Sequence, residues 1–500
     1  MPHDTNLSRD DAAIDPPAAP MLRVVRWLFV VFLFSFVFDY KDQTIGFGAA
    51  KTGGSLAQYA FLALAMASGG LVTLSGLRFL LVRPAVYMVI LWWGYVAFML
   101  VVAVLQGNEL GRILRLLLSP LLVGLAINAT LIAICMGMRA VEVVKWFLIA
   151  GCANVLWKLY FGLFHTGLSI TEVRMEVLSP AMNFLYAWVA CALLLRRKFT
   201  FWILVVLGLA LLPAVISITR SIAFPIFASA VGAVVCLAFA LFWKMYDVRH
   251  VVKKFGAIAG VALSSVALIV LLAAAQPRVA ERWMDRLFHN TGGGATKEDL
   301  SSLMRKAEAK DMWEILNKDP ETFIYGKGLG AGYHWHESFF PELFLVYPAD
   351  RHQFSGTIYT AGHSIWTYTL FSSGWIGICL TLGAFFYCMF LCLRAGQLNA
   401  RTVMGKRAPD TYLIFLPLVA MLATLSESIT RNPFDERYTG VLFGFMLALP
   451  QVFYNRYTYL MHREQLAEIT PQLILEEDDV PTDDWNGAFP AVPQLQQKSS

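Results

Sequence analysis

The residue with the clearest chemical potential is a histidine at the boundary between a polar and an apolar stretch. Gly362-His363-Ser364 opens an apolar run, and Gly374 and Gly377 follow within it. An imidazole titrates near neutral pH, so it can accept the proton of an attacking hydroxyl group. His363 is therefore our candidate catalytic base. The alternative interpretation is an interfacial histidine that only anchors the following helix.

Three arginines are candidates for binding an anionic group. Arg220 lies between two apolar runs, Arg305 lies on a predicted helix of the long polar segment, and Arg174 lies in a shorter polar segment. The planar guanidinium matches the geometry of a phosphate. We expect these arginines to meet a phosphate-bearing substrate. Alternatively, Arg220 extends to the bilayer surface and Arg305 is solvated on an exposed helix face.

The polar segment before the histidine also contains glycines and aromatic residues of interest. The run 326–332, GKGLGAG, lacks the GxxxxGK[ST] pattern of a nucleotide-binding loop. We interpret it as a tight loop in which Gly328 and Gly330 let backbone N–H groups approach an anion. Tyr333 and Trp335 would line a sugar groove or belong to an aromatic belt at the bilayer surface.

Neither a metal nor a cofactor is expected from the sequence. His334 and His336 are separated by one residue and lack a matching carboxylate pattern for a metal. The cysteines lie in apolar runs or at their ends, as small packing residues rather than a disulfide or zinc framework. They are Cys135, Cys152, Cys191, Cys236, Cys379, Cys388 and Cys392.

Composition assigns the rest of the chain to a membrane. Of the 500 residues, 57% are hydrophobic and 15% are charged, whereas soluble chains are about 25% charged. Apolar runs of about 20 residues recur, and each can cross a bilayer as a helix. We expect an all-α polytopic membrane protein with about twelve transmembrane helices and one large periplasmic loop that contains short helices. The expected spans lie within residues 23–39, 56–77, 84–105, 113–136, 146–165, 179–195, 200–219, 221–243, 255–275, 363–393, 411–430 and 439–455.

The charge distribution predicts how these spans are oriented. Basic residues concentrate in cytoplasmic loops, and here they fall in alternate loops, around residues 78–83, 139–145, 196–198, 244–254 and 394–407. With the N-terminus inside, the long polar loop then faces the periplasm of a bacterial inner membrane. Because the net charge of +5 is spread between the spans, no nucleic acid partner is expected.

These observations divide the chain into five parts. They are a disordered cytoplasmic segment 1–20, nine spans in 21–275, a periplasmic loop 276–362 with the candidate site residues, three spans in 363–455, and an acidic, disordered cytoplasmic tail 456–500. Within the loop, Leu300 to Lys318 has helical apolar spacing, and Asp319-Pro320 ends this predicted helix.

Several motifs together resemble one family. His363-Ser364 followed by Gly374-x-x-Gly377 resembles the histidine signature of the O-antigen ligase and O-antigen polymerase superfamily. The stretch from Arg305 through Met312-Trp313 to Gly326-x-Gly328-x-Gly330 is similar to the segment that precedes this signature, and Thr219-Arg220-Ser221 is similar to the family's Ser-Arg-Gly. The resemblance covers about residues 205–395, and the first two hundred residues match in hydropathy alone. The chain departs from the family pattern at four serines. The family often has Asn in place of Ser364, Gly in place of Ser221, and an acidic residue in place of Ser372 and Ser373.

The resemblance implies a metal-independent, inverting glycosyl transfer on the periplasmic face, with a glycan on undecaprenyl pyrophosphate as donor. Arg220 and Arg305, with Arg174, would bind the pyrophosphate. His363 would orient or deprotonate the acceptor hydroxyl. The acceptor would be a second lipid-linked repeat unit in a polymerase, lipid A-core in a ligase, or a protein hydroxyl in an oligosaccharyltransferase.

We expect a polysaccharide polymerase of O-antigen or exopolysaccharide biosynthesis, with the O-antigen ligase as the alternative. Its partners would be the undecaprenyl-pyrophosphate-linked oligosaccharide, membrane lipids, and the chain-length regulator and flippase of the same pathway. A polysaccharide transporter or flippase is a more distant alternative. It would need charged residues at mid-membrane facing a cavity, and here most charges lie at the ends of spans.

Overall fold

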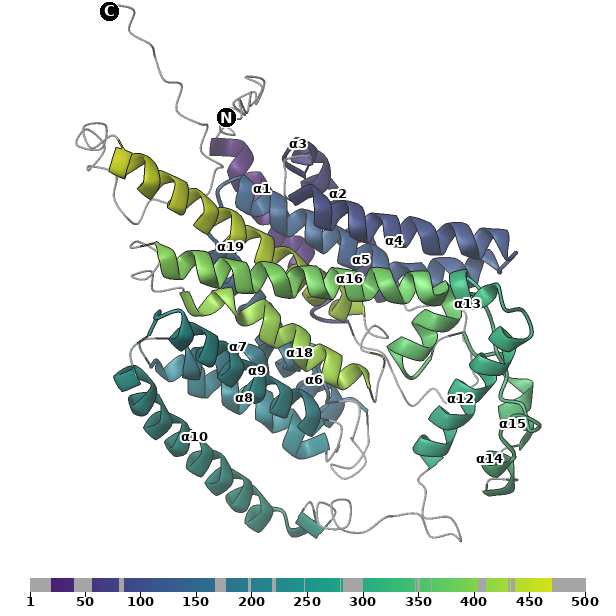
Figure 1. The fold of residues 1–500 in the computed structure, drawn as a ribbon. Coiled ribbons are helices and arrows are strands. Elements are labelled where there is room, and N and C mark those ends of the chain that lie inside the picture. Colours follow the sequence, from purple (N-terminus) through teal and green to yellow (C-terminus); the bar gives the residue numbers. More distant parts are fainter. Residues whose placement is uncertain are drawn as a thin grey trace, which may run out of the picture.

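The protein is a membrane-embedded helical bundle (Figure 1). The computed structural model describes residues 19–39, 56–80, 85–166, 177–196, 199–217, 222–246, 248–278, 280–281, 300–346, 348, 351–360, 362–402, 411–429, 432 and 437–469. Within these ranges the chain forms helices and no strand, which confirms the expected all-α fold for them. Disorder was predicted for residues 1–20 and 456–500. Where the structure describes these ranges the prediction is wrong, because residues 19–20 begin α1 and residues 456–469 continue α19. The remaining residues of both ranges lie outside the described residues.

The helices follow the predicted apolar runs closely. Their bounds are α1 Ala19–Phe34, α2 Leu56–Ser75, α3 Leu77–Leu80, α4 Ala85–Leu105, α5 Leu110–Cys135, α6 Ala140–Phe164, α7 Met182–Leu194, α8 Phe201–Ser217, α9 Ala223–Phe242, α10 Val248–Ala275, α12 Leu300–Asn317, α13 Thr322–Tyr325, α14 Pro341–Val346, α15 Arg351–Gly356, α16 Ile365–Arg401, η3 Thr411–Ile414, α18 Leu416–Ser428 and α19 Arg437–Ile469. Every range expected to span the membrane overlaps one of them. Among the described residues, 7 helices are long and apolar enough to cross a membrane, so the larger count stays a prediction.

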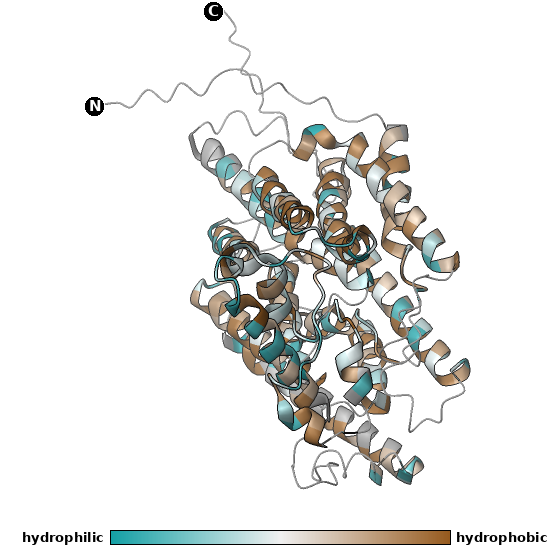
Figure 2. Ribbon diagram, turned by 90° about the vertical axis from the view of Figure 1, so that its right-hand side faces the viewer, coloured by the Kyte–Doolittle hydropathy of each residue, from teal (hydrophilic) through white to brown (hydrophobic). Residues whose placement is uncertain are grey.

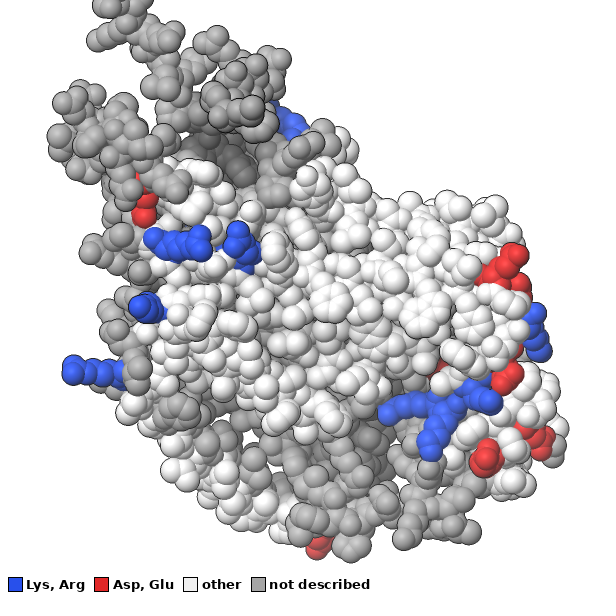
Figure 3. All heavy atoms as spheres, in the orientation of Figure 1, with Lys and Arg blue, Asp and Glu red and all other residues white. Residues whose placement is uncertain are grey.

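The bundle has two charged ends and an uncharged surface between them (Figure 3). The start of α1 and the end of α19 lie at one end, and α12 to α15 lie at the other (Figure 1). The long helices are largely hydrophobic (Figure 2). Most charged side chains on the face shown in Figure 3 gather at the two ends, and the broad surface between them is uncharged. This pattern is typical of a protein with an apolar belt that faces lipid.

Helix α5 forms the centre of the bundle and packs against α19. From Leu122 to Cys135 every residue of α5 is buried. On α19, Gly440 and Gly444 are four residues apart, and a side chain at Gly444 would overlap the carbonyl oxygen of Val123. Small residues at this spacing let two membrane helices approach closely, where van der Waals contact replaces the missing hydrophobic driving force.

A second hydrophobic core lies in the long loop, outside this bundle. The predicted helix from Leu300 is confirmed as α12, whose apolar face packs with Leu343 and Phe344 of α14 and Phe354 of α15. We call this assembly, residues 300–360, the loop unit. Residues 282–299, which precede it, lie outside the described residues.

The loop unit docks into a break in helix α16. At Gly374 the backbone has φ 62° and ψ −163°, which interrupts the helix and releases the carbonyl groups of the preceding turn. Two amides of the loop unit take these acceptors: Lys327 N–H donates to Phe371 O at 2.8 Å, and Gly328 N–H donates to Ser372 O at 2.9 Å. Two of the carbonyl groups at the break are thus hydrogen bonded to the loop unit, and the break separates a half-helix, residues 365–373, from the rest of α16.

Substituting Gly374 by alanine tests this interface. The positive φ disfavours any L side chain at a cost of about 1–3 kcal/mol, and the new Cβ would overlap the backbone of Ile324. We expect Gly374→Ala to lower the apparent melting temperature of the purified protein clearly. Gly383→Ala on the same helix is the matched control, because a Cβ there meets no atom within 4 Å. Equal melting temperatures for the two variants would contradict the docking role of the break.

Candidate functional site

His363 is held by a buried carboxylate at the point where the loop unit meets α16. Its backbone N–H donates to Glu308 Oε1 at 2.7 Å, and its ring Nδ1 lies 2.5 Å from Glu308 Oε2. The Glu308 side chain is 2% exposed and the His363 side chain is 32% exposed. The carboxylate therefore fixes the ring through Nδ1, and Nε2 lies outside this contact.

Glu308 is a site residue that the sequence interpretation missed. A buried carboxylate is costly unless it accepts several hydrogen bonds. Glu308 accepts two from His363 and a further one from the Tyr333 hydroxyl. Burial, followed by the charge of Glu308, raises the pKa of Tyr333, which therefore stays a hydrogen-bond donor. The signal was present in the sequence, because Glu308 lies on the apolar face of α12 at helical spacing from Met304 and Met312.

The segment around His363 is also fixed from the membrane side. Asn432 Nδ2 donates to the carbonyl oxygen of Gly362 at 3.2 Å, and Trp366 Nε1 donates to Ser428 Oγ at the end of α18 at 2.9 Å. Gly362 is closely surrounded, since a Cβ there would lie 2.9 Å from Tyr368 Cβ and 3.0 Å from Glu308 Oε1. His363 thus stands in a segment clamped between the loop unit and the bundle.

Of the three predicted arginines, Arg305 lies beside this pair. It precedes Glu308 by three residues on α12, and side chains at this spacing are neighbours on a helix. Arg305 is exposed, as are Lys306 and Lys310 on the same helix. Figure 3 shows Lys and Arg side chains gathered on this part of the surface. Arg174 and Arg220 lie outside the described residues.

The glycine run has a different role from the one predicted. The amide of Gly328 donates to Ser372, so it is occupied within the protein and does not face an anion. A Cβ at Gly328 would overlap Ala103, and one at Gly330 would lie 3.0 Å from the amide nitrogen of Ile113. The side-chain amide of Asn108 also donates to the carbonyl groups of Lys327 and Leu329. The glycines allow close docking onto α4 and α5, and for Gly328 this contact replaces the predicted approach of its backbone N–H to an anion.

Tyr333 and Trp335 do not line a surface groove or a bilayer belt. Both side chains are 0% exposed and belong to the core of the loop unit. Tyr333 exchanges two backbone hydrogen bonds of 2.9 Å with Tyr359, and the Trp335 ring stacks on the Tyr359 ring with centroids 4.4 Å apart. Their alternation with exposed His334 and His336 explains why sequence position alone suggested a surface.

Asp311 is a second buried acid, one turn after Glu308 on α12. It is 0% exposed, and both of its oxygens accept the backbone N–H of His336 at 3.2 Å. Burial raises its pKa from 3.8 to about 7, and the hydrogen bond from His336 opposes this rise. The fold therefore favours the protonated acid below neutral pH.

This shift predicts how the stability of the loop unit depends on pH. Between about pH 4 and pH 7 the folded state binds a proton at Asp311 that the unfolded state has lost, so the contribution of Asp311 to stability falls as the pH rises. Asp311→Asn keeps an acceptor for His336 and removes the titration. We expect its melting temperature to rise relative to wild type as the pH increases from 5 to about 7. A constant difference over this range would show that Asp311 is not protonated in the fold.

A scan of the chain against models of known protein families finds no match. A search of curated proteins likewise finds no significant match. The function of the protein is therefore inferred from its own site.

Proposed function

We propose that the protein transfers a glycan from undecaprenyl pyrophosphate to an acceptor hydroxyl, and that it acts as a polysaccharide polymerase. The observation that carries this proposal is the pair of His363 and Glu308. An imidazole oriented by a buried carboxylate through one nitrogen, with its side chain 32% exposed, is an arrangement suited to a general base.

The proposed step balances without a metal or a redox partner. The acceptor oxygen attacks the anomeric carbon while its proton passes to His363 Nε2. The bond from that carbon to the pyrophosphate oxygen breaks on the opposite face, so the configuration inverts. Undecaprenyl pyrophosphate leaves with the electron pair, and the imidazolium formed is stabilised by Glu308 until it releases its proton to water.

Arg305 supports an anionic leaving group. It is exposed on α12, three residues before Glu308, and a positive group that faces the departing pyrophosphate would stabilise its developing charge. Lys306 and Lys310 lie on the other side of this helix, where Lys310 pairs with Glu314 at 3.0 Å. Arg174 and Arg220 belong to the proposal through the family resemblance. The apolar bundle beneath the site suits a substrate whose polyprenyl tail stays in the lipid.

The orientation and the acceptor are also proposed. The basic loops favour a cytoplasmic location for the two termini, which would leave the site on the periplasmic side of a bacterial inner membrane. The acceptor would then be a second lipid-linked repeat unit.

Gel analysis of surface polysaccharide in a deletion strain tests whether the acceptor is a repeat unit. Single repeat units on lipid A-core, or loss of secreted polymer with intact lipopolysaccharide, would mean a polymerase. Long polymer retained on its carrier would instead mean a ligase.

Removing the base tests the enzyme class directly. We expect His363→Ala to lower glycan transfer by about 10²–10⁴-fold, the usual contribution of a general base. Glu308→Gln should lower it less, because the amide keeps some contacts but loses the charge that favours the imidazolium. His334→Ala, an exposed histidine of the loop unit, and Glu314→Gln, on the same helix, are the matched controls. Wild-type transfer by His363→Ala, at a normal level of protein in the membrane, would exclude the mechanism.

Arg305 provides a test of leaving-group binding. Arg305→Ala should raise KM for the lipid-linked donor and lower kcat, whereas Arg305→Lys should recover only part of the loss, because an ammonium group lacks the bidentate fork. Arg401→Ala, an exposed arginine at the end of α16, is the control and should transfer glycan normally. Unchanged kinetics for Arg305→Ala would mean that this arginine is only a solvated surface residue.

A further inference from the structure

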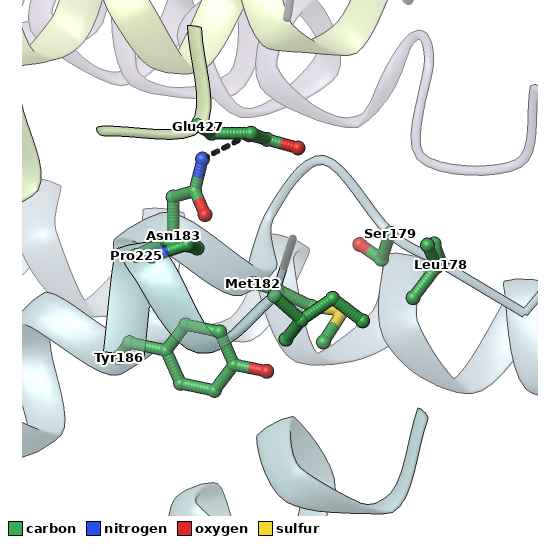
Figure 4. A pocket seen from close by; sticks show the side chains of 8 residues that line it. Leu178, Ser179, Met182, Asn183, Tyr186, Pro225 and Glu427 are labelled. Atoms are coloured by element: carbon green, nitrogen blue, oxygen red, sulfur yellow. Dashed lines mark hydrogen bonds between the residues drawn. The ribbon is translucent and has the colours of Figure 1, made fainter. Parts of the chain in front are cut away.

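A small pocket of mixed polarity lies where α7, α9 and α18 meet (Figure 4). It is lined by Leu178, Ser179, Met182, Asn183, Tyr186, Ile222, Pro225 and Glu427. Across its top Glu427 Oε2 accepts a hydrogen bond of 2.5 Å from Asn183 Nδ2. Figure 4 shows oxygen atoms of Glu427, Asn183, Tyr186 and Ser179 distributed around the Met182 side chain.

The pocket is coupled to the segment that holds His363. Glu427 is followed directly by Ser428, whose hydroxyl accepts the hydrogen bond from Trp366, the second residue of α16. The same end of the bundle contacts Gly362 through Asn432. Ile222, in the first turn of α9, lines the pocket two residues after the candidate Arg220. The pocket therefore borders the proposed site from the membrane side.

We propose that this pocket binds a hydroxyl or hydroxymethyl group of the sugar next to the carrier pyrophosphate. This proposal deepens the proposed function and rests on it. A sugar ring combines apolar C–H faces with hydroxyl donors. The lining matches both parts, since it includes the apolar side chains of Leu178, Met182 and Pro225 as well as the Glu427 carboxylate. A carboxylate has about four lone-pair sites, so Glu427 can accept a sugar hydroxyl in addition to its protein partners.

The size of the pocket sets how much of the sugar enters. The concavity measures about 320 Å³ only when the open solvent at its mouth is included, and its enclosed part is far smaller. Its interior has room for a group the size of one or two water molecules. A hydroxymethyl arm fits this space, while the ring itself lies at the mouth, toward His363.

Other ligands match the lining less well. A phosphate would meet the like charge of Glu427, which opposes its binding. A calcium or magnesium ion needs about six oxygen ligands. The lining supplies one carboxylate and one amide oxygen, and the hydroxyl groups of Ser179 and Tyr186 already donate to Asn154 and Ala210. A neutral group with hydroxyl donors is the class that the pocket recognises.

Binding of defined lipids to the full-length protein in detergent tests this proposal. The probes are undecaprenyl pyrophosphate without sugar and three carriers that bear glucose, galactose or N-acetylglucosamine, with Kd measured by native mass spectrometry. We expect wild type to bind at least one sugar-bearing lipid about tenfold more tightly than the bare carrier, as one hydrogen bond to a charged group would give. Glu427→Gln should lose most of this preference and bind the bare carrier as wild type does. Glu142→Gln is the matched control, because Glu142 pairs with Arg26 between α1 and α6, away from the pocket.

The outcomes separate this proposal from the proposed function. If wild type binds none of the lipids, the proposed function fails. If wild type binds the bare and the sugar-bearing carriers equally, or if Glu427→Gln keeps the sugar preference, the sugar pocket is wrong while the enzyme remains. If Glu427→Gln weakens the binding of bare and sugar-bearing carriers equally, Glu427 supports the fold or contacts the carrier instead of the sugar. This result also overturns the sugar pocket.

Discussion

The position of the loop unit against α16 depends on the hydrogen bonds that one buried carboxylate accepts. Glu308 is almost fully enclosed, and an unpaired charge at such a position would be strongly destabilising. Its partners come from two separate parts of the chain: His363, just before α16, through both its ring and its backbone, and Tyr333 in the loop unit. The charge is satisfied only when the loop unit and the start of α16 are docked together. The same contacts that stabilise the fold therefore also set the tautomer and the direction of the imidazole.

The docking surface is built largely from backbone. Gly328, Gly330 and Gly374 remove side chains where the loop unit touches α4, α5 and α16, and amides of the loop unit bond the carbonyl groups released at the break. Asn108 adds a side-chain clamp from the turn between α4 and α5. In the bundle, Gly440 and Gly444 serve the same purpose between α5 and α19. Close approach of main chain joins the two parts, together with apolar side chains that cross between them: Leu329 lies in the bundle core and Phe371 in the core of the loop unit.

Much of the fold follows from the sequence, and less of the site does. Apolar runs and helical spacing predicted the membrane helices and α12, because both depend on local pattern and length. His363 was recognised from its position at a polar boundary. Glu308 was not, since its importance arises from pairing with a residue 55 positions away. For Gly328, Tyr333 and Trp335 the residue types indicated a special structural role, but the sequence did not show which residues they would contact. Glycines suit a phosphate loop or a tight helix contact equally well, and alternating aromatic residues suit a surface belt or a small core.

The break at Gly374 also decides where this protein can be divided. The half-helix 365–373 shares its hydrogen bonds and Phe371 with the loop unit, and it carries His363 at its start. In sequence it belongs to a membrane helix, yet in structure it is the last element of the loop unit. A chimaera that exchanged the loop at the predicted membrane boundary would cut the carboxylate away from its histidine. The natural junction for recombination and for engineered loop exchange is therefore Gly374, inside the helix.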